Sequence, residues 1–131
     1  MPVAADAQAA SFRIGALNPV TGAGSPYGTG MQKMIIAAAE EVNAAGGAGG
    51  RRLEVFAEDG QAQPQAAVLA AKKLIEVNNV RAILGTWSSG VSLAVIPLTN
   101  DANILLMNTS GAPALSTPPA NAKGLSYRFQ A

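Results

Sequence analysis

The sequence predicts an α/β fold in three layers, with helices on both faces of a mainly parallel sheet. Short apolar runs bounded by turn residues alternate with segments whose apolar residues recur at helical spacing. Connections as long as a helix favour right-handed crossovers between parallel strands. Two of the runs, Val80–Gly85 and Ile104–Met107, are nearly continuous in apolar residues, which is typical of strands buried on both faces.

The first strand and the first helix are expected between residues 12 and 47. Phe12–Leu17 is an apolar run that ends in the turn Asn18-Pro19 and a glycine-rich loop. Ser25-Pro26 predicts a helix start, since serine is a good N-cap and proline is tolerated at the first helical position. The apolar residues of this helix share one face, which we expect to be buried: Tyr27, Met31, Met34, Ile35, Ala38 and Val42. Gly46-Gly47 ends the helix.

The second unit has the same order of strand and helix. Leu53–Ala57 alternates in polarity and stops at Glu58-Asp59-Gly60. Pro64 then opens a second helix, with Lys72 and Lys73 in its later turns, where positive charge favours the helix dipole. The predicted buried stripe of this helix is Ala67, Ala71, Leu74 and Ile75.

Val80–Gly85 is the third strand. A third helix is expected after it over Gly90–Ala102, with a kink at Pro97 because proline removes a backbone hydrogen bond. Ile104–Met107 is the fourth strand. A loop containing several prolines leads from Ala112 to Lys123, and Leu125–Phe129 forms a short fifth run.

Composition excludes several classes of protein. The 131 residues contain no histidine and no cysteine, which excludes histidine-dependent catalysis, thiolate nucleophiles and thiolate zinc sites. Charged residues make up 13% of the chain and the net charge is +1, so no footprint for nucleic acid is visible. No apolar run approaches the roughly 20 residues that span a bilayer. We expect no metal site, no cofactor, no nucleic-acid partner and no direct insertion into a membrane.

The first eleven residues are expected to lie outside the folded domain. They are rich in alanine and contain Ala-x-Ala patterns like the end of a secretory signal, without the charged and apolar regions that precede such an end. Two interpretations stay open: the remnant of a trimmed signal from an exported protein, or a disordered leader. The domain itself is expected over residues 12–131, with no internal linker.

The candidate site is expected at the carboxyl edge of the sheet, where ligands of open parallel sheets bind. Four polar, glycine-rich segments reach that edge: Asn18 to Tyr27, Glu58 to Gln61, Thr86 to Gly90, and Asn108 to Gly111. Ser88-Ser89 opens a helix whose free N–H groups and partial positive charge suit a carboxylate, and Gly90 lets a ligand approach the backbone. The alternative for both serines is simple N-capping.

Two aromatic residues are candidates for walls of the site. Trp87 lies in a loop after a strand rather than on a core face, where it is better placed to contact the apolar body of a ligand. Tyr27 is a second wall or only part of the helical stripe. Asn108, Thr109 and Ser110 are either binding residues or a polar stop after a buried strand.

A nucleotide site is the alternative at the same edge. Gly22 to Gly28 resembles a dinucleotide fingerprint, but its third glycine comes one residue late and Pro26 interrupts the backbone that would cradle a phosphate. Asp59, after the second strand, could hold a ribose. A third interpretation is a self-associating half-domain that binds no ligand.

The order and spacing of many short segments resemble a known family. They are Arg13-Ile14-Gly15, Pro19-Val20-Thr21-Gly22, Tyr27-Gly28, Glu40-Glu41-Val42-Asn43-Ala44-Ala45-Gly46-Gly47, Gly50, Asp59, Pro64, Ala67, Leu74-Ile75, Ile83-Leu84-Gly85, Ser88-Ser89, Pro97 and Ser110-Gly111-Ala112. From about residue 12 onward the chain resembles the N-terminal part of the Leu/Ile/Val-binding type I periplasmic binding proteins, the substrate-binding components of ABC importers.

The resemblance implies a flavodoxin-like lobe, incomplete here, that closes with a second lobe on an amino acid or a related small carboxylate or amide. In that family the serine at the Ser89 position binds the ligand carboxylate, helped by groups at the Thr109, Ser110 and Gly111 positions. An aromatic at the Tyr27 position lines the site. Trp87 and Ser88 occupy adjacent positions in the ligand-facing loop.

The same resemblance implies a non-catalytic, periplasmic protein that presents its closed form to an ABC permease. Family members are much longer than this chain, and the acidic residue that receives an α-amino group comes from the second lobe. The identity of the ligand therefore does not carry over. An isolated lobe is expected to bind weakly, and its exposed sheet edge favours a homodimer.

Overall fold

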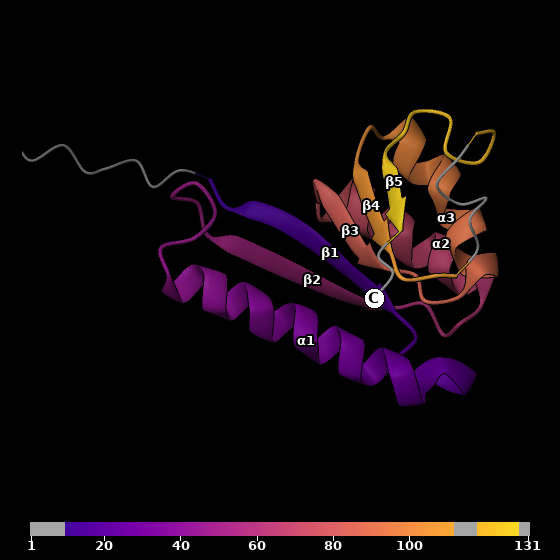
Figure 1. The fold of residues 1–131 in the computed structure, drawn as a ribbon, viewed down its shortest axis with the longest axis horizontal. Helices are drawn as coiled ribbons and strands as arrows, with labels where there is room; N and C mark the ends of the chain where they lie inside the picture. The colour runs from indigo at the N-terminus through magenta and orange to yellow at the C-terminus, as the bar shows by residue number, and fades with distance from the viewer. Residues whose placement is uncertain (1–9, 112–117, 129–131) are drawn as a thin grey trace, which may run out of the picture.

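The computed structural model describes residues 10–111 and 118–128. Most of the expected leader lies outside these ranges, as do residues 112–117 of the proline-containing loop, and Phe129. Figure 1 shows the strands side by side, with one long helix along β1 and β2 and two further helices behind the other strands.

Every predicted strand is found, with ends that differ from the predicted ones by no more than two residues. The strands are β1 (Phe12–Asn18), β2 (Leu53–Asp59), β3 (Ala82–Gly85), β4 (Leu105–Asn108) and β5 (Ser126–Arg128). The helices are α1 (Ser25–Ala44), α2 (Pro64–Lys72) and α3 (Ser89–Asp101), with a short 3-10 turn η1 (Gly22–Gly24) before α1 and a π-helical turn η2 (Lys73–Val77) after α2. Pro97 lies inside α3.

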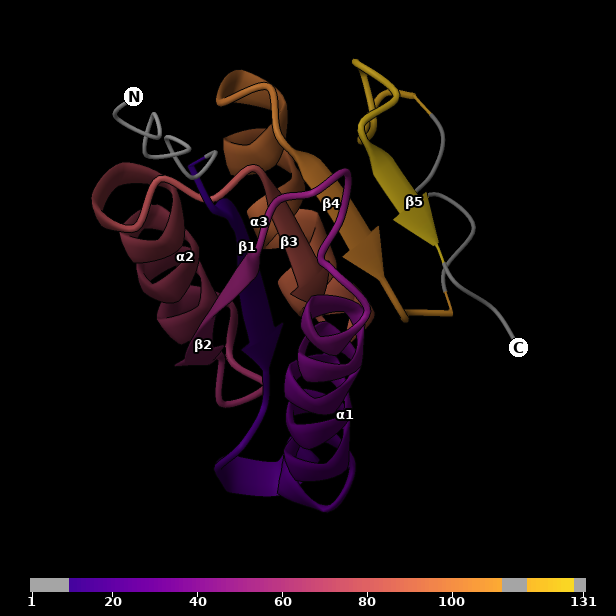
Figure 2. The same cartoon turned by 90° about the vertical axis from the view of Figure 1, so that its left-hand side faces the viewer.

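The strands pair in parallel in the order β2-β1-β3-β4-β5. This is the order of flavodoxin-like folds, in which the chain reverses direction across the sheet between β1 and β3. The strand arrows all point downward in Figure 2, so the carboxyl ends of the strands form one edge, and α1 begins at that edge. The fold therefore places the loops after β1 and β3 at the switch point where such sheets bind ligands.

The main core lies between the sheet and the helices α2 and α3. Its fully buried members come from β1, α2, η2, β3, α3 and β4: Leu17, Ala67, Ala71, Leu74, Ile83, Val95, Ile96 and Leu106. The predicted stripe of the second helix is confirmed, since these members include Ala67, Ala71 and Leu74, and Ile75 packs against them. Its small alanines allow α2 to lie close to α3.

The predicted buried face of α1 is wrong. Tyr27 and Met34 are 60% and 74% exposed, and Val42 is exposed as well. The buried residues of α1 are instead Gly28, Gln32 and Ala39. The helix α1 lies over β1 and β2, and Gln32 is bonded to both strands. Its apolar stripe lines grooves beside the sheet, so that Met31 and Ile35 are only half-buried.

Candidate functional site

The register of the sheet brings the loops of the candidate site together. Asn18 pairs with Asp59 at the ends of β1 and β2, and Leu17 pairs with Gly85 at the end of β3. Gly85 in turn pairs with Asn108 at the end of β4. The four polar segments predicted from the sequence therefore leave the sheet at one edge, as expected.

The loop after β1 is held by the carboxylate of Asp59. Its Oδ1 accepts hydrogen bonds from the backbone N–H groups of Val20 at 2.9 Å and Gln61 at 2.8 Å, and its Oδ2 accepts one from the Thr21 hydroxyl. Burial raises the pKa of this carboxyl, but the bonds from the Thr21 hydroxyl and from the N–H groups of Gln61, Val20 and Thr21 outweigh it, and the net shift is downward. Asp59 thus bonds to its own chain, and the ribose role considered above has no support from this geometry.

The turn before α3 separates the roles of its two serines. Ser88 is the N-cap, and its hydroxyl accepts a hydrogen bond from the Val91 N–H at 3.4 Å. Ser89 is the first helical residue and Gly90 follows it. Within the described residues, neither the Ser89 hydroxyl nor the Ser89 and Gly90 N–H groups have a hydrogen-bond partner. Capping therefore accounts for Ser88 and leaves three donors of the next two residues free for a ligand.

The two candidate aromatic residues contact each other. The rings of Tyr27 and Trp87 stack with centroids 5.1 Å apart and planes 15° from parallel. Tyr27 stands at the start of α1 and Trp87 in the turn before α3, so the pair joins the loops after β1 and β3. A cavity of about 10 Å³ lies against Trp87, which is room for one water molecule. This cavity has no room for a solute larger than water.

The end of β4 contributes one exposed and one buried hydroxyl residue. Thr109 is exposed, and so is Gly111, whose carbonyl accepts a hydrogen bond from Arg128 at 2.9 Å. Ser110 is 2% exposed, and both its N–H and its hydroxyl lie within 3.3 Å of Asn108 Oδ1. Among the expected binding residues here, Thr109 presents its side chain to solvent, whereas the Ser110 side chain bonds inward.

Sequence reasoning missed a buried polar cluster beneath the site. The Asn18 side-chain amide donates to Gln32 Oε1 at 2.7 Å, and Gln32 Nε2 lies 3.2 Å from the Ala16 carbonyl oxygen and 3.1 Å from that of Glu58. Gln32 is 6% exposed and joins α1 to two strands. A signal was present: Gly28, Gln32 and Ala39 share a helical face, and the small residues let α1 approach the sheet.

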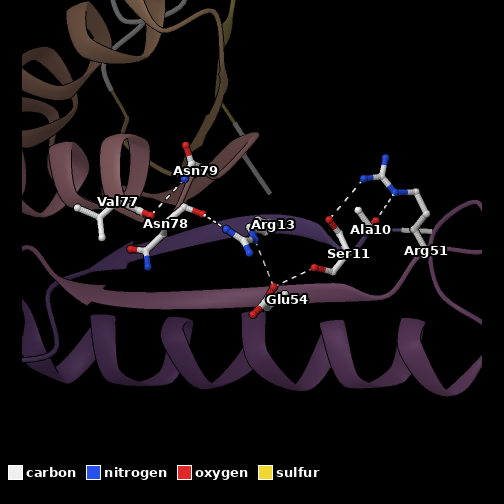
Figure 3. Close-up of polar contacts among 8 residues, drawn as sticks. All are labelled: Ala10, Ser11, Arg13, Arg51, Glu54, Val77, Asn78 and Asn79. Atoms are coloured by element: carbon white, nitrogen blue, oxygen red, sulfur yellow. Dashed lines mark hydrogen bonds and ion pairs between the residues drawn. The ribbon is translucent and has the colours of Figure 1, made fainter. Parts of the chain in front are cut away.

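Polar contacts at the other end of the strands have a structural role. Near the start of β1, Arg13 donates to the Asn78 carbonyl at 3.0 Å and pairs with Glu54, while Arg51 donates to the Ala10 carbonyl (Figure 3). These contacts lie away from the carboxyl edge. Among residues 10–111 and 118–128, no cluster of acidic residues could hold a metal ion, and no helix is long and apolar enough to cross a membrane.

Comparison with known proteins identifies the class that this fold and edge define. The family model described as periplasmic binding protein matches residues 11–131, and the chain belongs to that family. The chain is 28% identical over 117 residues to an amino acid binding protein of Pseudomonas aeruginosa, an alignment that covers 89% of this chain and 30% of the relative.

Two solved structures show the same fold. A branched-chain amino acid transporter substrate-binding protein from Streptococcus pneumoniae, solved with isoleucine, superposes with a TM-score of 0.81 at 24% identity, over 90% of this chain and 34% of the other. An ABC transporter substrate-binding protein from Sphaerobacter thermophilus superposes with a TM-score of 0.77 at 30% identity, over 90% of this chain and 32% of the other. This chain thus spans about a third of the length of these proteins. Both support the expected α/β lobe.

Proposed function

We propose that this chain is a lobe of a periplasmic, non-catalytic substrate-binding component of an ABC importer. We propose further that its carboxyl edge binds the carboxylate of an amino acid or a related small acid. The observation that carries the proposal is the turn before α3, where the Ser89 hydroxyl and the N–H groups of Ser89 and Gly90 have no partner in the described structure. Free donors at a helix N-terminus stabilise an anion without a basic residue.

The neighbouring residues supply the rest of one binding surface. The stacked Tyr27 and Trp87 rings give an apolar wall beside the serine turn. Thr109, exposed at the end of the adjacent strand, offers a hydroxyl, and Gly111, two residues further on, is exposed as well. The amino acid binding relative and the structure solved with isoleucine support a ligand of this class. Closure by a second lobe would bury the ligand and present a closed form to a permease.

The proposal is tested by titrating the 131-residue chain with solutes that differ in one group. Trp87 is the only tryptophan, so its fluorescence reports on the site, and amide shifts in nuclear magnetic resonance spectra detect weak binding. Aliphatic and aromatic amino acids should shift the amides of residues 86–90 and 109–111, whereas the matching amino alcohols, which lack the carboxylate, should not. Shifts produced only by NAD or ATP, or by no solute, would refute the proposal.

Substitution of Ser89 tests the assigned contact. Ser89→Ala should weaken carboxylate binding by about 1.5 to 3 kcal/mol, the range for a hydrogen bond to a charged group, or roughly tenfold to a hundredfold in the dissociation constant. Ser11→Ala is the matched control, because Ser11 bonds to Glu54 at the opposite end of the strands. Equal affinities of the two variants would leave Ser89 with no role beyond the helix terminus.

A second proposal is self-association of the chain through the side of α1. Two adjoining apolar grooves of about 360 and about 440 Å³ lie between α1 and the sheet. No charged residue lines either groove, and Met34, which lines both, has 74% of its surface exposed. An exposed apolar side chain at a groove suits a two-fold interface, in which each copy places its Met34 in the groove of the other.

Sedimentation at increasing protein concentration tests this second proposal. The wild-type chain should form dimers, and Met34→Lys should shift it to monomers because a charge would be buried at the interface. Val77→Lys is the control, since Val77 is 67% exposed on η2, away from the grooves. A wild-type chain that stays monomeric throughout the series contradicts the proposal.

A further inference from the structure

The turn between β3 and α3 has an unfavourable backbone conformation. Thr86 has a φ of +59° although it is a β-branched residue, and Gly85 before it has a φ of +131°. Positive φ is rare for residues that branch at Cβ, and such a conformation costs on the order of 1 to 3 kcal/mol. Because Thr86 is 1% exposed, water does not stabilise it. Other contacts must hold the turn in place.

One buried hydroxyl meets both ends of this turn. The Oγ of Ser92 lies 2.8 Å from the carbonyl oxygen of Thr86, 3.0 Å from its hydroxyl oxygen and 3.1 Å from the carbonyl oxygen of Ser88. Ser92 is fully buried, one turn inside α3. A hydroxyl has a single hydrogen, so Ser92 donates to one carbonyl at a time, while the Thr86 hydroxyl can donate to it in return.

These contacts bracket the residues that carry the candidate site. Trp87 lies between the two carbonyl groups that Ser92 reaches, and Ser89 and Gly90 follow directly. The backbone N–H of Ser92 adds a bond of 2.9 Å to the Ser88 carbonyl. At the start of the turn, the Thr86 N–H donates to the Leu17 carbonyl at 2.7 Å, which anchors it to β1. Ser92 is thus the one side chain of the described structure that bonds to both residues flanking Trp87.

We propose that Ser92 is the positioning residue of the turn over residues 86–90, and that it sets the orientation of Trp87 and of the donors at Ser89 and Gly90 without touching the ligand. The effect on ligand affinity rests on the proposed function. The effect on the turn does not, because it follows from the contacts within the chain. Serine and alanine differ only by the hydroxyl, so Ser92→Ala leaves little cavity and isolates the effect of the hydroxyl.

The test compares Ser92→Ala with Thr99→Val. Thr99 is also fully buried in α3, and its hydroxyl donates to the Ile96 carbonyl at 3.0 Å, away from the turn. Both variants lose one buried hydroxyl and some stability. Only Ser92→Ala should increase the quenching of Trp87 fluorescence by acrylamide and reduce the near-ultraviolet circular dichroism of the Tyr27 and Trp87 pair. These readouts need no ligand and are taken where far-ultraviolet spectra show both variants folded.

Three outcomes decide the inference. If Trp87 responds in Ser92→Ala alone, Ser92 positions the turn, even when the wild-type chain binds no solute and the proposed function fails. If Trp87 responds equally in both variants or in neither, the inference is wrong. Should Ser92→Ala fail to fold, backbone order parameters of the wild-type chain give the answer. The order parameters of residues 87–89 should match those of α3, at about 0.85, and order parameters below about 0.6 would overturn the inference.

Discussion

Gly85, at the end of β3, has no room for a side chain. Its φ is +131°, and an added Cβ would lie 2.1 Å from the carbonyl oxygen of Leu17 and 2.8 Å from the side-chain oxygen of Asn18. The Leu17 carbonyl accepts the N–H of Thr86 at 2.7 Å. Gly85→Ala therefore strains the backbone and displaces the bond that anchors the turn to β1.

The expected loss of stability combines two effects. A non-glycine residue in a rarely populated conformation costs about 1 to 3 kcal/mol, and loss of a backbone hydrogen bond adds about 0.5 to 1.5 kcal/mol. Because the clashing atom belongs to the backbone, rotation of a side chain cannot relieve it. Gly85→Ala should therefore destabilise the chain by about 1.5 to 4.5 kcal/mol.

Gly90→Ala is the matched control for this substitution. Nothing lies within 4 Å of a Cβ added at Gly90, which sits in the first turn of α3. Alanine there should be neutral or stabilise the chain by up to about 1 kcal/mol. Urea unfolding followed by far-ultraviolet circular dichroism measures both, with about 1 to 3 kcal/mol of change per molar urea. Midpoints that agree within error for the two variants would refute the assigned strain.

Two further predictions concern the polar groups under the loops. The pKa of Asp59 is lower in the folded chain than in the unfolded chain. The ionised carboxylate therefore stabilises the fold above the unfolded pKa of about 3.9, and this stabilisation is lost as pH falls through the folded pKa. The Asp59→Asn variant should lose less stability than wild type between about pH 7 and about pH 3, and an equal loss in urea unfolding would argue against the assigned role. Gln32→Met keeps most of the side-chain volume but removes the hydrogen-bond partner of the Asn18 amide and of two strand carbonyls. Thermal unfolding should show a loss of stability of about 2 to 4 kcal/mol. A loss below about 1 kcal/mol would mean that water replaces the glutamine.

Much of the fold follows from short-range patterns. The stripe of α2 was predicted correctly because its alanines and Leu74 contact α3 and the sheet directly, so the helical period coincides with burial. The same reasoning failed for α1, because periodicity finds an apolar face but does not say what packs against it. The exposure of Met34 depends on which strands α1 covers.

The candidate site divides in the same way. Ser88 and Ser89 were found as a pair from the sequence, but capping and binding could not be separated there. The structure assigns capping to Ser88 through the bond from the Val91 N–H, and Ser89 stays the proposed binding residue. The contact of Asp59 with the loop after β1 could not be predicted, because two of its donors, Val20 and Thr21, lie 39 and 38 residues away along the chain.

By itself, the sequence determined that strands and helices alternate, where each strand begins and ends to within two residues, and which polar turns reach the carboxyl edge. These properties depend on neighbours within a few residues, through capping, glycine and proline geometry, and apolar period. Only the tertiary structure decided that β1 lies between β2 and β3, that Tyr27 stacks on Trp87, and that Ser92 lies beneath the serine turn. Those contacts join segments whose proximity is set by strand pairing and helix packing, and no local pattern records it.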